Sequence, residues 1–396
     1  MANVSSSNGL EKRPKLRFPG FDEPWSIYKA EELFKNVADK NHPMETVLTI
    51  IQGKGTLPRE QAGRNIHYDD ASLANYKKVE QGDFIIHLRS FEGGLEMANE
   101  DGIVSPAYTI LRCMKPHSSL FYEAYFHTDE FINHILSKSV EGIRDGRQIS
   151  YEAFKWLGLP YCDLSEQERI AQLFCTLSHR IEKQQQMVDA LKKYKRGLFN
   201  QIFSAISKSS QCRKLRELVR VSGGKTPSMS NSLYWNGDIV WISSKDMKSS
   251  RISGSELKIT NLALNEMTLY HPGTLLLVAR SGILKHSLPL AILEVDATIN
   301  QDIKALQVHG CNAFYLYYAI LSQEDTIIRT LVKTGTTVQS LMMDSFLNIE
   351  IPTPDIEQQQ RIIDKLTKLE KYVEVQEKEL SLLSQMRNGL LQQLFI

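Results

Sequence analysis

The sequence predicts an α+β protein made by tandem duplication, in which each copy is a globular part followed by a long helix. Three observations predict this class. Residues 159–204 and 351–396 align without a gap at an offset of 192. Both stretches carry apolar residues at alternating steps of three and four, the spacing of a coiled coil. The remaining residues mix short apolar runs, which are typical of buried strands, with glycine-rich turns and shorter helical stretches.

The duplication is visible as identical residues at matching positions. Pro160 matches Pro352, and Arg169 matches Arg361 at the same offset. The matches continue outside the helical stretches, since Arg89 matches Arg280 at an offset of 191. An offset close to half of the chain indicates that the globular parts are duplicated together with the helices.

Each helical stretch carries one apolar seam. The predicted seam positions of the first copy are Ile170, Phe174, Leu177, Ile181, Gln184, Val188, Leu191, Tyr194, Leu198 and Ile202. Those of the second copy are Ile362, Leu366, Leu369, Val373, Gln376, Leu380, Leu383, Met386, Leu390 and Leu394. A helix with such a stripe cannot bury it alone, so we expect the two helices to pack on each other. The glutamine at the same place in both seams either fixes the register or is a chance polar intrusion.

The repeat divides the chain into five segments. Residues 1–15 form a polar tail, 16–158 the first globular part, 159–206 the central long helix and a linker, 207–350 the second globular part, and 351–396 the C-terminal long helix. Residues 204–211 are polar and are predicted to belong to the linker. Buried strands are expected at 84–86, 239–242 and 275–278, and helices near 121–136 and 312–330.

The composition is that of a globular protein, with 42% hydrophobic and 23% charged residues among 396. Because no run of about 20 apolar residues occurs, no membrane span is expected, and the start of the chain has no apolar signal core. We therefore expect a cytoplasmic protein. Five scattered cysteines without a C-x-x-C pair argue against disulfides and zinc knuckles. The formal net charge of +1 is a mild argument against binding nucleic acid, unless a basic stripe or partner chains supply the phosphate contacts.

Motifs of catalysis are missing from the sequence. The run Gly223-Gly224-Lys225-Thr226 lacks the upstream glycine of a phosphate loop. The sequence contains no Asn-Pro-Pro-aromatic motif, no H-E-x-x-H, no G-x-S-x-G and no metal-ligand cluster among its histidines. This favours a binding protein over an enzyme, with no metal site.

Several motifs, taken in order, resemble those of the specificity subunits of type I restriction-modification systems. Those of the first copy are Arg17-Phe18-Pro19-Gly20-Phe21 with Trp25, then Gly102-Ile103-Val104-Ser105-Pro106-Ala107-Tyr108, then Ser165-Glu166-Gln167-Glu168-Arg169-Ile170. Those of the second copy are Gly223 to Ser228, Tyr234 to Ser243, Arg280-Ser281-Gly282, Asn300 to Leu306, and Glu357 to Ile362. The first copy lacks the Gly-Gly-Lys-Thr-Pro loop and the Tyr-Trp-Asn-Gly-Asp run, so contacts of the second copy cannot be transferred to it.

The resemblance implies a non-catalytic chain that reads DNA. Its two globular parts would be target recognition domains, related by a pseudo-two-fold axis and joined by antiparallel coiled-coil helices. They would read the two halves of a bipartite site on double-stranded DNA, while the helix pair sets the spacing and docks two modification subunits. Two restriction subunits would complete the assembly. The chain itself would hold no cofactor, since S-adenosylmethionine and ATP would bind the partner subunits.

Side chains suited to DNA are polar or cationic and lie in glycine-rich loops. Arginine reads guanine, asparagine and glutamine read adenine, and lysine, serine and threonine hold phosphates. The candidates are Lys54, Arg59, Arg64, Arg89, Arg144 and Arg147 in the first domain, and Lys225, Thr226, Lys245, Arg280, Asn300, Gln301, Thr336, Thr337 and Gln339 in the second. Any of them can instead be a solvated or capping side chain, and Asn300 and Gln301 can be structural turn residues.

Two other functions remain open from the sequence. One is a self-contained DNA-modifying enzyme with unusual motifs, which would bind S-adenosylmethionine. The other is a coiled-coil scaffold protein without a role on nucleic acid.

Overall fold

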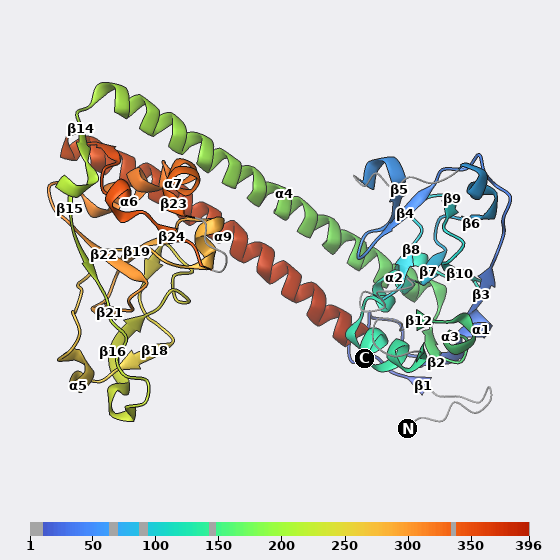
Figure 1. The fold of residues 1–396 in the computed structure, drawn as a ribbon. Coiled ribbons are helices and arrows are strands. Elements are labelled where there is room, and N and C mark those ends of the chain that lie inside the picture. Colours follow the sequence, from blue (N-terminus) through green and yellow to red (C-terminus); the bar gives the residue numbers. More distant parts are fainter. Residues whose placement is uncertain (1–10, 63–69, 87–93, 142–147, 334–337, 396) are drawn as a thin grey trace. The chain divides into compact units, whose positions relative to one another are not determined.

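In the computed structural model, residues 11–62, 70–86, 94–141, 148–333 and 338–395 are described. The chain folds as two compact units, of which the first combines residues 1–186 with 377–396 and the second contains 187–376. Both contain helices and sheets, which confirms the α+β class. Two long helices, α4 (Leu164–Ser209) and α9 (Ile356–Phe395), each contribute to both units (Figure 1).

The globular part of the first unit is built from short strands and short helices. The strands are β1 (Glu11–Lys12), β2 (Trp25–Lys29), β3 (Phe34–Val37), β4 (Leu48–Ile51), β5 (Gly55–Pro58), β6 (Lys77–Val79), β7 (Phe84–Ile86), β8 (Glu96–Met97), β9 (Gly102–Val104), β10 (Thr109–Cys113), β11 (Val140–Glu141), β12 (Gln148–Ile149) and β13 (Gly158–Tyr161). The helices are α1 (Ala30–Leu33), α2 (Ser119–Phe126), α3 (Tyr151–Phe154), the 3-10 turns η1 (Arg59–Ala62), η2 (Asp70–Asn75) and η5 (Leu136–Ser139), and the π-helix η4 (Glu130–Ile135).

The second unit has a similar inventory. Its strands are β14 (Cys212–Lys214), β15 (Val219–Gly223), β16 (Trp235–Ile242), β17 (Arg251–Ile252), β18 (Leu257–Ile259), β19 (Leu275–Val278), β20 (Leu290–Leu293), β21 (Ala297–Ile299), β22 (Ile303–Val308), β23 (Val332–Lys333), β24 (Ser340–Leu341) and β25 (Glu350–Pro352). Its helices are α5 (Asn261–Leu264), α6 (Ala313–Leu321), α7 (Glu324–Leu331), α8 (Met343–Phe346) and the 3-10 turns η7 (Leu215–Glu217), η8 (Ser232–Tyr234) and η9 (Gly282–Lys285).

The main sheets of the two units have equivalent strand orders. The first unit has the order β3-β10-β7-β8, and the second has β15-β22-β19-β20-β17. In each, the first four strands are antiparallel to their neighbours. The duplication therefore covers the sheets as well as the helices, although few residues in these strands are identical.

Equivalent hydrogen bonds hold each sheet domain to the start of a long helix. Tyr122 donates to the carbonyl of Pro160 in the first unit, and Tyr315 donates to the carbonyl of Pro352 in the second. The buried amide of Gln167 bonds the Ser118 backbone and the Cys162 carbonyl. Gln359 bonds the Asn312 backbone and the Pro354 carbonyl in the same manner. The Gln-x-Arg-Ile motif thus fixes the helix start by satisfying backbone groups that would otherwise be buried without partners.

The opening motif of the chain is also structural. Arg17 forms a two-pronged pair with the carboxylate of Glu166, at 2.9 and 2.7 Å, and the indole of Trp25 donates to the same carboxylate at 2.9 Å. Glu166 is 1% exposed, and such a buried carboxylate requires its charge to be compensated. The motif therefore ties the N-terminal segment to the start of α4.

Both long helices enter the apolar cores. Leu391, Leu394 and Phe395 of α9 pack in the core of the first unit with Ile170 and Phe174 of α4. In the second unit the core includes Phe199, Phe203 and Ile206 of α4 and Ile362, Ile363 and Leu366 of α9. The end of the chain is therefore part of the domain that begins it.

Within each unit the helices run antiparallel. In the first, Phe174 lies 6.1 Å from Phe395 between ring centroids, whereas the later Arg180 pairs with the earlier Glu379 at 3.4 Å. In the second unit, Lys195 pairs with Glu370 at 2.7 Å. Numbering that rises along α4 thus falls along α9.

Most of the predicted seam positions are buried or half-buried, and one position in the second half of each helix is exposed. Seam positions that are buried are Ile170, Phe174, Leu177, Val188, Ile362, Leu366, Val373, Leu383 and Leu394, while Ile181, Gln184, Leu191, Leu198, Ile202, Leu369, Gln376, Leu380 and Leu390 are half-buried. Tyr194 and Met386, predicted on the seam, are 59% and 48% exposed. An α-helix drifts by about 20° per heptad from a strict seam. In the second half of each helix the buried face turns away from the predicted seam, toward Phe199, Phe203 and Ile206 in α4 and toward Leu391 and Phe395 in α9.

The predicted linker is wrong. Helix α4 continues to Ser209 because Phe203 and Ile206 extend its apolar face into the core of the second unit. At its other boundary, α4 begins at Leu164, because residues 158–161 form β13 and pair with β2. The expected strands at 84–86, 239–242 and 275–278 are confirmed as β7, the end of β16 and β19.

Candidate nucleic-acid interface

One edge of the main sheet in the second unit gathers most of the candidate residues. Strand β15 ends at Gly223, which pairs with Lys304 near the start of β22, and β19 ends at Val278, which pairs with Ile303. The segments that follow β15 and β19 and precede β22 therefore meet at this edge. They carry Lys225-Thr226, Arg280 and Asn300-Gln301 respectively. We call this the polar edge.

The side chains of the polar edge are mainly exposed and rich in donors. Lys225, Thr226, Arg280 and Gln301 are exposed. The hydroxyl of Thr226 donates to the side-chain carbonyl of Gln301, which orients that amide. An oriented amide and a guanidinium are the groups that read adenine and guanine in the major groove.

Two further candidates, Gln339 and Lys245, border the polar edge. Gln339 is half-buried, and its carbonyl accepts from the backbone of Ser281 at 3.1 Å, beside a bridge between Arg280 and Ser340. Lys245 is exposed and lies three residues after β16, whose last residue Ile242 pairs with Ile299. Thr336 and Thr337 lie outside the described residues.

Asn300 has a different environment from its neighbour Gln301. It is 6% exposed, and its side-chain oxygen accepts from the backbone of Asp302 at 3.2 Å. A buried asparagine in this geometry closes a turn. Between the two roles left open by the sequence, its position favours the structural one.

The aromatic motif before the polar edge positions it. The indole of Trp241 donates to the carbonyl of Lys225 at 3.1 Å, and Trp235 packs on Trp241 edge-to-face with centroids 5.2 Å apart. The hydroxyl of Tyr270 donates to the carbonyl of Gly223 at 2.9 Å. These bonds hold the Gly-Gly-Lys-Thr loop against the sheet.

Replacement of Gly224 by alanine should destabilise the second unit by about 1–3 kcal/mol or more. A Cβ at this position would lie 2.0 Å from the carbonyl oxygen of Ile299 and 2.4 Å from that of Asn300, so a strand has to move. Urea unfolding of the full chain measures the loss. Gly254→Ala is the matched control, because a Cβ there meets nothing within 4 Å. Equal stability of the two variants would contradict the close approach.

The first unit has an equivalent edge, of which the structure describes a part. Its candidates Arg64, Arg89, Arg144 and Arg147 lie outside the described residues. Arg59 lies in η1, with its guanidinium 5.9 Å from the ring centroid of Tyr76. Burial raises the pKa of Tyr108, the residue just before β10, and the positive charge of Arg59 acts in the opposite direction and lowers it. Arg59 therefore lies close to the edge.

Two lysines near this edge were not predicted from the sequence. Lys40 is exposed and follows β3, while the ammonium of Lys77 donates to the carbonyl of Tyr108 at 2.6 Å. Burial, together with the nearby charge of Lys40, lowers the pKa of Lys77. No repeat signal marks either residue, because β3 and β15 match in topology and not in sequence.

Lys54 lies apart from the edge, at the tip of the β4–β5 hairpin, where it is exposed. The buried carboxylate of Glu96 holds this hairpin by accepting from the backbones of Gly53 and Gly55 at 2.7 and 3.0 Å. On its other side, Glu96 is 3.8 Å from Nε2 of His127, whose Nδ1 donates to the Glu123 carbonyl at 2.7 Å. The hairpin that presents Lys54 is thus tied to helix α2 through a carboxylate–imidazole pair.

We predict that this pair makes the stability of the first unit depend on pH. Burial alone would lower the pKa of His127, but Glu96 and the Glu123 carbonyl outweigh it and raise the pKa above 6.5. The stabilisation is therefore fully present below pH 6.5 and is lost as pH rises through the raised pKa of folded His127. Unfolding of His127→Gln should lack this pH dependence, whereas exposed His309→Gln should keep it. A wild-type slope retained in His127→Gln would contradict the assignment.

Among the described residues, no group of three histidine, cysteine or acidic side chains is arranged to hold a metal ion. In the same part of the chain, no helix is long and apolar enough to cross a membrane.

The sequence of this chain is similar to those of known specificity subunits. A family model described as the type I restriction modification DNA specificity domain matches residues 207–385. The specificity subunit of the type I restriction enzyme EcoR124I/EcoR124II of Escherichia coli is 32% identical over 252 residues, 61% of this chain and 62% of the relative. The specificity subunit of the type I restriction enzyme MjaIX of Methanocaldococcus jannaschii is 30% identical over 197 residues, 48% of this chain and 45% of the relative. The matches thus span less than two thirds of each relative.

Solved structures extend the likeness in fold to nearly the whole chain. The S subunit of a type I restriction-modification system from M. genitalium superposes with a TM-score of 0.60 at 15% identity, covering 97% of this chain and 99% of that one. A chain from a study of complex assembly and conformational transition in a type I restriction-modification system gives 0.57 at 15% identity, covering 95% and 98%. Residues 207–385 therefore match the type I restriction modification DNA specificity domain, and the resemblance of the chain to type I specificity subunits, predicted from the sequence, is confirmed.

Proposed function

We propose that this chain is the DNA specificity subunit of a type I restriction-modification complex. Each unit reads one half of a bipartite site on double-stranded DNA. The antiparallel helices set the distance between the half-sites and dock two modification subunits, and two restriction subunits complete the assembly. The complex works in the cytoplasm, and the chain has no catalytic role of its own.

The polar edge of the second unit carries the proposal. It places a guanidinium, an oriented amide, a hydroxyl and an ammonium at one end of a sheet, inside the segment that matches the DNA specificity family. These are the groups used for base readout and phosphate positioning. The chain does not need a large net charge, because the donors are concentrated in one place and modification subunits would supply further phosphate contacts.

The S-adenosylmethionine that is used for methylation and the ATP that is consumed by the restriction subunits bind the partner subunits in this proposal. The absence of a phosphate-loop motif and of an amino-methyltransferase motif from the sequence supports this division.

The test is binding of the chain, assembled with modification subunits, to a library of DNA duplexes. We expect salt-sensitive binding, with affinity that depends on sequence at two positions of the duplex separated by an unread spacer. Binding without sequence dependence would contradict the proposal. Calorimetry of the chain alone with S-adenosylmethionine distinguishes the modifying enzyme, which would bind it, from the specificity subunit, which would not. A coiled-coil scaffold would retain no DNA at low salt.

A further inference from the structure

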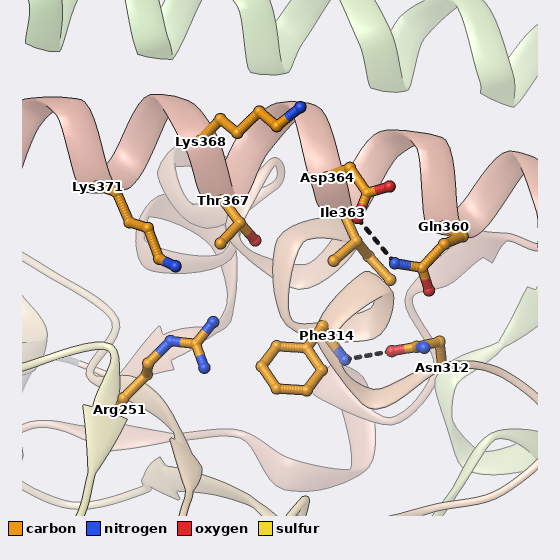
Figure 2. A pocket seen from close by; sticks show the side chains of 9 residues that line it. All are labelled: Arg251, Asn312, Phe314, Gln360, Ile363, Asp364, Thr367, Lys368 and Lys371. Carbon is orange, nitrogen blue, oxygen red and sulfur yellow. Dashed lines mark hydrogen bonds between the residues drawn. The ribbon is translucent and has the colours of Figure 1, made fainter.

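The second unit contains a cavity of about 440 Å³ between its sheet domain and helix α9 (Figure 2). The domain side contributes Arg251 from β17 and Phe314 from α6. The helix side contributes Ile363, Thr367 and Lys371 from successive turns of α9. This volume is in the range of sites that bind small molecules. The cavity is separate from the polar edge, since it shares no residue with it.

Two cations face each other across the cavity. Figure 2 shows the ammonium of Lys371 pointing from α9 toward the guanidinium of Arg251 on the opposite wall. Arg251 is held in place, because its guanidinium lies 4.9 Å from the ring centroid of Phe314 and its Nη1 donates to Glu294 at 3.0 Å. A guanidinium pre-oriented in this way keeps further N–H groups available for a second acceptor.

The carboxylate in the cavity does not cancel this charge. Asp364 accepts from the amide of Gln360 at 2.9 Å, and both lie at the end of the cavity away from Arg251 and Lys371 (Figure 2). The hydroxyl of Thr367, near the middle, is engaged with the hydroxyl of Tyr318 at 3.0 Å. Glu294 compensates the charge of Arg251 at this end, so the positive charge that remains there is that of Lys371, beside the apolar surface of Phe314.

We propose that this cavity binds a small ligand through a phosphate group, either free phosphate or the phosphate of a nucleotide. The phosphate oxygens would accept from the remaining N–H groups of Arg251 and from the ammonium of Lys371, in charge-assisted hydrogen bonds. The space beside Phe314 and Ile363 accommodates a less polar portion of the ligand. A bound phosphate would link the sheet domain of the second unit to α9, because its two cationic partners come from opposite walls.

The first unit provides an internal comparison. An equivalent cavity of about 650 Å³ is lined by Ala171, Cys175 and His179, which the repeat aligns with Ile363, Thr367 and Lys371. Its walls also include the carboxylates of Glu123 and Glu182, beside Arg387. In this cavity His179 stands at the position of Lys371, and the described lining residues from the sheet domain include no arginine at the place of Arg251, so we expect the second unit alone to bind phosphate. The stoichiometry is then one phosphate per chain, despite the duplicated fold.

Isothermal titration calorimetry of the full chain with inorganic phosphate, and separately with ATP, tests the proposal at constant ionic strength in chloride. We expect saturable binding at one site per chain. Arg251→Gln and Lys371→Gln should each weaken it by about tenfold or more, because each removes a charge-assisted hydrogen bond. Lys365→Gln is the matched control, since Lys365 is exposed on α9 and does not line the cavity.

The measured affinities distinguish a nucleotide from free phosphate as the ligand. Tighter binding of ATP than of phosphate identifies a nucleotide as the ligand, and equal affinities identify phosphate alone. An absence of saturable binding, two sites per chain, or affinities unchanged in both cavity variants would overturn the proposal. Thermal unfolding without ligand checks that the variants are folded. If Arg251→Gln unfolds the domain because the Arg251–Glu294 pair is lost, Lys371→Gln still tests the proposal, since that pair is intact in it. DNA binding is a separate measurement, so neither result decides the other.

Discussion

Replacement of Phe395 by alanine is expected to lower the free energy of unfolding of the first unit by about 3–5 kcal/mol. Phe395 is fully buried, and its ring centroid lies 5.2 Å from that of Phe121, 5.5 Å from Tyr125 and 6.0 Å from Trp25. Its removal leaves a cavity among rigid aromatic neighbours that cannot close around it. Because Trp25 borders this cavity, urea unfolding followed by tryptophan fluorescence reports the loss directly.

Leu382→Ala is the matched control for Phe395→Ala. Leu382 lies on the same helix and is 54% exposed, so its truncation should change stability by about 0.5 kcal/mol or less. If the two variants were equally stable, the end of α9 would not form part of the first domain's core. The closed path of the chain, in which its last helix completes its first domain, would then be wrong.

Replacement of Arg280 by alanine in the assembled complex should lower discrimination at one base pair of one half-site by about tenfold to a hundredfold. A bidentate arginine–guanine pair contributes about 1–3 kcal/mol of discrimination. Arg280 is exposed at the polar edge, where its backbone is fixed by the bridge to Ser340. The other half-site should be read as before, because it belongs to the other unit. Competition binding with duplexes altered one base pair at a time measures both effects.

Two variants sharpen this prediction. Arg280→Lys keeps the charge and loses the bidentate geometry, so it should retain the salt dependence of binding and lose the discrimination. Lys208→Ala removes an exposed charge at the end of α4, away from the edge, and should change neither. A loss in Arg280→Ala that is uniform across sequences would assign Arg280 to a phosphate instead of a base. Unchanged binding would remove it from the interface.

The repeat made most of the architecture predictable. Because the offset holds over the whole helical stretch, it predicts a long helix in both copies. Apolar runs such as 84–86 and 275–278 identify central strands. Helix ends were less predictable. The extension of α4 to Ser209 depends on Phe203 and Ile206 meeting a core made by residues more than 60 positions away, such as Leu275. The polar composition of residues Ser204 to Gln211 by itself suggests a linker in place of a helix.

The candidate site was predictable from the sequence only for the motif residues that lie at the polar edge of the second unit. Lys225, Thr226, Arg280 and Gln301 come together because three antiparallel strands bring their ends to one edge. The burial of Asn300 could not be read from the sequence, since its neighbour Gln301 has similar chemistry and is exposed. In the first unit the equivalent edge adds Lys40, which only the strand order identifies.

Two duplicated units should read two separate halves of one DNA site. Footprinting of the chain, assembled with modification subunits on its preferred duplex, tests this arrangement. We expect two protected blocks whose base preferences are independent, separated by a spacer that tolerates any sequence. A single contiguous block in which every base pair affects affinity would contradict it.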